Sequence, residues 1–485
     1  MKRLISACMM MAAFSFVSAQ NSFFDDYNNF LREAREEYNS FRDQANKEYA
    51  DFLAAPWESV KLEELVKPIE KTKPPRPIEE NEFREEDRSF RYDKVVKPAP
   101  PKPQPTPVEP VVVQPKPSDK WLSFSYLGRT DRVRVPADLR NVVRDVSENG
   151  IASAWKEISN GSFDPTLSDC LELRKKNNLP DWAYINMLDI IAGKIFPASR
   201  NDATLLTAWL YSQSGYQMRL ARDNGSNLVI MFATDHIIYG PYYKLDGTNY
   251  FPFKYKPSSL DISRASFPNE KQMSLVLTSL PETDARLSEP RNRKSRQYPE
   301  MNFDLQVDEN IIDFFNTYPN SQLGDDMMTR WAIYANTPLS REVREQLYPQ
   351  IRQKISGLSD REKVQHILNW VQTGFVYEYD DVVWGGDRAF FPDETIYYPY
   401  ADCEDRAILF TRLVRDLVDL DAILVYYPGH LASAIAFNGN EAGDYITLNG
   451  RRFTVCDPTF VTGAPVGRTG SDYDNSTAIV ILLNR

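Results

Sequence analysis

The chain has 485 residues, enough for two or three domains that each have a full hydrophobic core. Its formal net charge of −11 argues against nucleic acid or anionic lipid as the main partner. Four cysteines are too few for a disulfide framework, and neither they nor the three histidines have the spacing of metal ligands. We therefore expect no cofactor and no metal.

The first nineteen residues have the layout of a secretory signal peptide. Lys2 and Arg3 precede an apolar run, and Ala19 ends a small-residue cleavage site. Cys8 resembles the acylated cysteine of a bacterial lipoprotein, but the apolar segment before it is too short for that signal. We expect cleavage after residue 19 and a secreted, periplasmic or cell-envelope protein. No later segment is long and apolar enough to span a bilayer, so the chain is predicted not to be transmembrane.

Residues 20–56 are predicted to form one long amphipathic helix. Apolar side chains recur every three or four positions between residues 22 and 54, and no glycine or proline interrupts them before Pro56. So narrow an apolar stripe is typical of a coiled-coil seam or a docking face, which implies a protein partner or self-association through residues 22–54. Packing of the helix on its own chain is the equally supported alternative.

Residues 57–118 are predicted to be a proline-rich linker. Thirteen of the 33 prolines in the chain lie between Pro68 and Pro117. Proline at this density favours extended polyproline conformation and cannot build a core, so we expect a semi-rigid spacer between the helix and the domains that follow.

Two α+β regions follow, each with helices first and antiparallel strands after. Region 119–290 has a predicted hairpin at 121–135, helices at 139–158, 182–195 and 203–210, and strands at 218–221, 228–233, 242–243 and 250–255. Region 291–485 has predicted helices at 347–355, 362–372 and from Cys403 onward, strands at 375–379, 423–427, 431–437, 445–448, 452–455 and 478–483, and an aromatic loop at 384–400.

The repeated order suggests a duplication in which the first region is a degenerate copy of the second. Aligning the helices places Ser199 opposite Cys403, whereas aligning the strands places His236 opposite His430. Neither alignment brings a cysteine into place, so the first copy would be catalytically silent.

Cys403 is predicted to open an amphipathic helix. Asp402 is a favourable N-cap residue, and Glu404 and Asp405 fill the first turn, where acids are preferred. Free N–H groups and the positive end of the helix dipole would stabilise a thiolate, the form that attacks a carbonyl carbon. A small buried cysteine with no chemical role is the alternative.

Two residues downstream complete a chemical set. His430 lies 27 positions after Cys403 (430 − 403), at the start of a predicted strand, and Asp457 lies 27 positions further on (457 − 430), at the end of another. A nucleophilic thiol needs a base for its proton, and an imidazole needs an acceptor that fixes its tautomer. On its own, His430 would be interpreted as a core histidine and Asp457 as an acid in a turn at the end of a strand. Cys456 should be buried and inert, with no disulfide to Cys403.

Three strings in this region, ADCEDRAILF, GHLASAI and CDPTF, resemble the signatures of the transglutaminase-like cysteine superfamily over about residues 340–465. The resemblance implies a papain-like α+β core in region 291–485, with Cys403 as nucleophile, His430 as general base and acid, and Asp457 as the residue that orients the imidazole. It also implies a protein or peptide substrate.

The sequence departs from the family pattern after the histidine, where Leu431 and Ala432 replace a common Ala-Trp pair. We expect the oxyanion donors among the backbone N–H of Cys403 and the side chains of Trp384 and Tyr398. The predicted function is a secreted thiol-dependent amide-bond hydrolase or acyl transferase that forms a thioester. The alternative is a catalytically silent transglutaminase-fold binding or scaffold protein of the cell envelope, which the N-terminal helix, the linker and the silent first copy favour.

Overall fold

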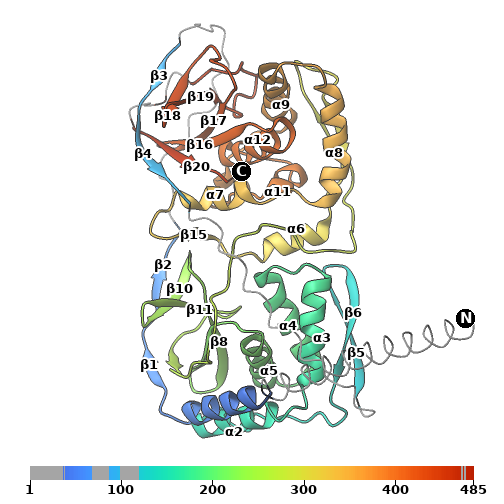
Figure 1. Cartoon of the computed structure of the whole chain (residues 1–485), viewed down its shortest axis with the longest axis vertical. Helices are drawn as coiled ribbons and strands as arrows, with labels where there is room; N and C mark the ends of the chain where they lie inside the picture. Colours follow the sequence, from blue (N-terminus) through green and yellow to red (C-terminus); the bar gives the residue numbers. More distant parts are fainter. Residues whose placement is uncertain are drawn as a thin grey trace, which may run out of the picture.

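The computed structural model describes residues 37, 39–67, 87–98, 119–470, 473 and 477–484. Over these residues the chain is an α+β protein, as predicted, and its two halves each pack helices on a curled seven-stranded sheet (Figure 1). The predicted signal peptide, Cys8 and residues 20–36 of the predicted N-terminal helix lie outside the described residues. Within the described ranges, no helix combines the length and the apolar character needed to cross a membrane.

The first half is built around an antiparallel sheet that curls into a half-barrel. Its elements are strands β1 (Glu58–Val60), β2 (Glu63–Leu65), β7 (Met218–Asp223), β8 (Asn227–Ala233), β10 (Gly240–Leu245), β11 (Thr248–Pro252) and β12 (Leu260–Ile262), helices α2 (Glu148–Ile158), α3 (Asp164–Lys176), α4 (Asp181–Ile195) and α5 (Arg200–Gln213), and a hairpin of β5 (Lys120–Tyr126) and β6 (Arg129–Val135). The strand order is β1-β12-β7-β8-β11-β10-β2, and α5 packs on β8.

The second half is built around a mixed sheet that nearly closes into a barrel. Its strands are β3 (Ser89–Phe90), β4 (Tyr92–Val96), β16 (Asp421–Tyr427), β17 (His430–Ala436), β18 (Tyr445–Leu448), β19 (Arg451–Cys456) and β20 (Ala478–Leu482), and its helices are α7 (Thr329–Asn336), α8 (Arg341–Lys354), α9 (Asp360–Gly374), α10 (Asp380–Val383), α11 (Pro392–Tyr397) and α12 (Cys403–Val418). The strand order is β3-β18-β19-β17-β16-β20-β4, and α12 packs on β16 and β17.

A short connecting region joins the two halves. It contains a hairpin of β13 (Arg291–Lys294) and β14 (Asn302–Leu305), helix α6 (Glu309–Asn316), and strand β15 (Ser321–Leu323), which pairs with β9 (His236–Ile238).

The two sheets share one topology. In each half a helix (α5 or α12) leads into a hairpin (β7-β8 or β16-β17), then a second hairpin (β10-β11 or β18-β19), and then a strand (β12 or β20) that returns beside the first hairpin. This order aligns the starts of α5 and α12 and of β8 and β17 at the same offset of 203 residues, so that Arg200 is opposite Cys403 (403 − 200) and Asn227 is opposite His430 (430 − 227).

This alignment corrects the two that we drew from sequence. Ser199 is one position away from the residue opposite Cys403, because it is the N-cap of α5 as Asp402 is the N-cap of α12. His236 is not the counterpart of His430, since it lies in β9, beyond the end of β8. The first half therefore has Arg200 in place of the cysteine and Asn227 in place of the histidine.

The range predicted to be a continuous linker contributes edge strands to both sheets, which corrects that prediction. β1 and β2 pair antiparallel with β12 and β10, and β3 and β4 pair parallel with β18 and β20. Figure 1 shows these strands along one side of both halves. The two stretches without proline, 57–67 and 78–97, contain all four strands, since proline cannot donate to a ladder. Residues 68–86 and 99–118 lie outside the described residues.

The described part of the N-terminal helix, residues 39–53, packs on the first half of the same chain. The ring of Tyr49 lies 4.5 Å from that of Trp155, Asn46 Nδ2 donates to Gln213 Oε1 at 3.0 Å, and Arg42 pairs with Asp164 at 2.7 Å. Of the two alternatives for this helix, packing on its own chain therefore accounts for residues 42–53.

Three other predicted elements differ from the structure, and one helix of the first half was not predicted. Residues 139–147 are not helical, because the backbone N–H groups of Val142 and Val143 donate to Asp202 and α2 begins only after Ser147. Helix α3 was not predicted. The predicted strand 375–379 is a single bridge between Val376 and Tyr400, and the aromatic loop 384–400 contains α11.

Candidate active site

Cys403 is the first residue of α12, at the place where the sequence predicted a helix to begin. The Asp402 N-cap is held by Asp405, whose Oδ2 accepts the Asp402 backbone N–H at 3.2 Å. The other oxygen of Asp405 accepts from the backbone N–H of Phe390 at 2.9 Å, which ties the loop to the helix tip. Cys403 is 4% exposed. Because α12 packs on β16 and β17, the sulfur lies beside the sheet.

His430 and Asp457 form a buried hydrogen-bonded pair. Nε2 of His430, the first residue of β17, lies 3.0 Å from Oδ2 of Asp457. The other carboxylate oxygen, Oδ1, accepts from the hydroxyl of Thr459 at 2.6 Å and from its backbone N–H at 3.0 Å. Within the described part of the chain, Nδ1 of His430 is buried and has no hydrogen-bond partner. A hydrogen on Nε2 satisfies Asp457 and leaves Nδ1 as a free base.

The sulfur of Cys403 lies at the start of β17. The backbone N–H of Leu431, the residue after His430, donates a hydrogen bond to it. Tyr473 stacks on His430 with ring centres 4.4 Å apart and planes 7° apart, and Tyr427 stacks on Tyr473 at 5.1 Å. The structure thus pairs His430 with Asp457 and places Leu431, the residue after His430, near the Cys403 sulfur; it also places at His430 a tyrosine that the sequence gave no signal to find.

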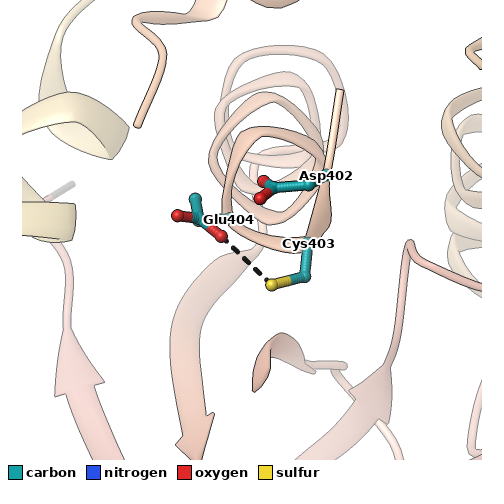
Figure 2. Close-up of side chains that lie close together, drawn as sticks. All are labelled: Asp402, Cys403 and Glu404. Carbon is teal, nitrogen blue, oxygen red and sulfur yellow. Dashed lines mark hydrogen bonds between the residues drawn. The ribbon is translucent and has the colours of Figure 1, made fainter. Parts of the chain in front are cut away.

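The Cys403 thiol donates to a carboxylate. Its Sγ lies 3.1 Å from Oε2 of Glu404, the next residue of the helix (Figure 2). Burial raises the pKa of the Cys403 thiol well above its usual value, and the charges of Glu404 and Asp402 raise it further, while the Leu431 N–H lowers it. This runs against the expectation of a thiolate: burial of the thiol, with the charges of Glu404 and Asp402, outweighs the effect of the helix N-terminus.

Glu404 belongs to a cluster of buried acids that the sequence analysis missed. Burial, followed by the charge of Asp387, raises the pKa of Glu404 to about 7. Burial, followed by the charge of Glu404, raises that of Asp380 to about 8. Lys67 and Arg330 each approach Asp387, with nitrogen–oxygen distances of 3.4 and 3.5 Å, and supply part of the countercharge. The signal available in the sequence was the run Asp402 to Asp405 around the cysteine.

The prediction of no metal considered histidine and cysteine spacing and did not consider these acids. Three groups place one ligand atom from each residue within 4.8 Å of the others: Asp402, Cys403 and Glu404; Asp380, Asp402 and Asp405; and Asp380, Asp387 and Glu404. Carboxylate oxygens at this spacing suit a hard divalent cation, but spacing alone assigns no ion.

The two predicted oxyanion side chains belong to a different cluster. The rings of Trp384 and Tyr398 lie 4.9 Å apart, with the guanidinium of Arg388 4.4 Å above Trp384. The hydroxyl of Tyr398 donates to Asn316 Oδ1 at 3.2 Å. These contacts hold both side chains to one another and to Arg388.

The remaining cysteines of the described ranges are buried free thiols. Cys456 ends β19, opposite Ser433 of β17, and has no disulfide to Cys403, as predicted. Burial raises the pKa of both the Cys456 and the Cys170 thiol.

No protein-family model and no curated protein matches the chain. The transglutaminase-like resemblance rests on the three motifs themselves.

Proposed function

We propose that the second half is a thiol enzyme that hydrolyses amide bonds, or transfers their acyl groups to amines, through a thioester on Cys403. The observation that carries the proposal is the His430–Asp457 pair, with Nδ1 of the imidazole left free next to the chain segment that contacts the sulfur. The pair is further supported by the elements that carry the three residues: Cys403 opens α12, His430 opens β17 and Asp457 follows β19. Core packing alone does not require a cysteine, a histidine and an aspartate at these places.

In the proposed reaction the thiol proton of Cys403 passes to Nδ1 of His430 as the sulfur attacks the carbonyl carbon. The carbon–nitrogen bond then breaks, and the same proton leaves on the amine. Water or a second amine, activated by Nδ1, attacks the thioester and releases the thiol. Asp457 holds the Nε2 hydrogen throughout and stabilises the imidazolium. The reaction requires the sulfur to turn from Glu404 toward His430.

The finer fold assignment, a papain-like core of the transglutaminase type, is part of this proposal. It is supported by α12, which carries Cys403 at its tip and packs on β17, and by β19, which ends next to Asp457 and pairs with β17. A protein or peptide substrate in the secreted, periplasmic or cell-envelope space is the class of partner that fits this chemistry.

A screen of labelled peptides, with and without an added primary amine, tests the function. Wild-type protein should release the acyl part as a free acid or as an amide of the added amine, which distinguishes hydrolysis from transfer. Cys403→Ala should abolish both products, whereas Cys456→Ala, a buried cysteine outside the proposed site, should keep them. Product formation that survives in Cys403→Ala would reject the proposal.

A silent binding or scaffold protein is the second candidate, and one observation favours it. The Cys403 thiol is 4% exposed, donates to Glu404 and has a raised pKa, which together describe an unreactive thiol. The two candidates differ in the reactivity of Cys403 in the folded protein: an enzyme reacts with peptide-like electrophiles faster than an ordinary buried cysteine, and a scaffold does not.

A further inference from the structure

A cavity of about 780 Å³ lies at the opposite end of α12 from Cys403. Its walls come from α8, from the C-terminal part of α12 and from residues 276–278 of the first half, and Asn484 also lines it. A cavity of this volume matches those that hold small molecules, which are mostly between about 300 and 1,000 Å³. The triad residues are not among those that line it.

The walls of this cavity are strongly basic, although the whole chain has a net charge of −11. Five arginines line it, whereas Glu345 and Asp416 are the only carboxylates that line it among the residues that the structure describes. The lining arginines are Arg341, Arg344, Arg352, Arg412 and Arg415. Clefts with one sign of charge concentrate ligands of the opposite sign.

Two of the lining arginines are already paired with acids. Asp416 accepts from Tyr348 and from Arg412, its neighbour one helical turn earlier. Arg341 pairs with Glu282 at 3.1 Å and with Glu342 at 2.8 Å. Glu345, the other lining carboxylate, is exposed, so the wall carries five guanidinium groups against two carboxylates.

Arg344 and Arg352 are exposed, and no carboxylate of the described ranges lies within ion-pair distance of either. The one hydrogen bond of Arg352 is to the backbone carbonyl of Asp416, at 3.4 Å. Nε of Arg412 is buried and has no hydrogen-bond partner there. Arg344 and Arg352 thus line the cavity with guanidinium groups that have no carboxylate partner within the described residues, and Arg412 adds a third positive charge to the wall.

Arg415 adds positive charge that the fold holds in place. Its guanidinium donates to Thr411 O at 3.1 Å, to Asn336 Oδ1 at 3.0 Å and to Asn484 O at 2.6 Å, and none of these acceptors is a carboxylate. Burial, followed by the charge of Arg412, lowers the pKa of Arg415 to about 9, so the group is charged at neutral pH without a carboxylate of its own.

We propose that this cavity binds a small molecule with two or more oxyanion groups, phosphate or carboxylate, held by Arg344, Arg352 and Arg412. Guanidinium groups present planar pairs of N–H donors that match the oxygens of phosphate and carboxylate. The binding is independent of the thiol chemistry proposed for Cys403, and its test does not use that activity.

Isothermal titration calorimetry of the full chain with pyrophosphate and with citrate tests the proposal, with sodium chloride at matched ionic strength as the blank. We expect saturable one-site binding of at least one probe and a rise in melting temperature with that probe. Binding of pyrophosphate alone identifies a phosphate ligand, binding of citrate alone a carboxylate ligand, and binding of both a site for either oxyanion. Heats no larger than those of the blank for both probes would overturn the proposal.

Two variants locate the site. Arg344→Gln with Arg352→Gln should weaken binding about a hundredfold, because loss of one charge-assisted hydrogen bond costs about tenfold in affinity. Arg296→Gln, an exposed arginine that does not line the cavity, should bind like wild type. Since both cavity arginines are exposed, the double variant should fold, which its melting temperature checks. Equal affinity in the double variant and wild type would show that the anion binds elsewhere.

Discussion

Asp393 allows a quantitative test of how burial shifts the pKa of a carboxyl group in this fold. It is fully buried in α11, and both of its carboxylate oxygens accept from the backbone N–H of Ser340, at 3.2 and 3.0 Å. Burial raises the pKa of Asp393 from 3.8 to about 7, against the lowering effect of the Ser340 hydrogen bonds. Each pKa unit is worth about 1.4 kcal/mol, so the difference corresponds to about 4 kcal/mol.

The direction of the pH dependence follows from proton binding. Between pH 3.8 and about pH 7 the folded protein keeps a proton on Asp393 that the unfolded chain has lost, so the free energy of unfolding falls as the pH rises through this window. Above about pH 7 both states are ionised, and the full cost is present. Asp393→Asn keeps a carbonyl oxygen for the Ser340 N–H and has no charge to bury.

Urea unfolding of wild type and Asp393→Asn at pH 4.5, 6 and 8 measures the effect. We expect the stability of the variant relative to wild type to rise by about 3 to 4 kcal/mol between pH 4.5 and pH 8. Comparison with the variant removes the contributions of the other buried acids, such as Glu404, which both proteins share. A stability difference that stays constant with pH would refute the assigned pKa and its cause.

Three further substitutions test the site. Glu404→Gln removes a carboxylate that disfavours the Cys403 thiolate. The rate of Cys403 alkylation should therefore increase by about tenfold or more at pH 8, where Glu404 is ionised, and by less at pH 6. Thr459→Val should cost about 1–3 kcal/mol in urea unfolding, since Asp457 loses the Thr459 hydroxyl, and Thr459→Ser should be close to wild type. Arg406→Met should cost about 3–5 kcal/mol, because this buried guanidinium satisfies three backbone carbonyls; a cost below about 1 kcal/mol would contradict that role.

Local patterns predicted the elements that carry the site. The helix at Cys403 and the strands that start at Asp421 and His430 follow from an N-cap residue, from apolar periodicity and from alternation, all of which act within a few residues. The hairpin 121–135 was predictable for the same reason.

Features that depend on distant parts of the chain were not predictable. Strands β3 and β4 pair with segments more than 350 residues away, such as Tyr445 opposite Ser89, and nothing in the local sequence names the partner. The raised pKa of the Cys403 thiol was missed for the same reason, because its largest cause is burial, which depends on parts of the chain that fold over the helix tip, and the charges of Glu404 and Asp402 only add to it.

Site-resolved mass spectrometry after treatment with a peptide that carries a thiol-directed electrophile tests the central claim most directly. The account predicts one adduct per chain at Cys403 in the folded protein, no adduct at Cys456, and labelling at least about a hundredfold slower in His430→Ala, since general-base catalysis contributes about 10²–10⁴. Labelling of Cys403 at the same rate in wild type and His430→Ala, or undiminished labelling of Cys403→Ala, would contradict it.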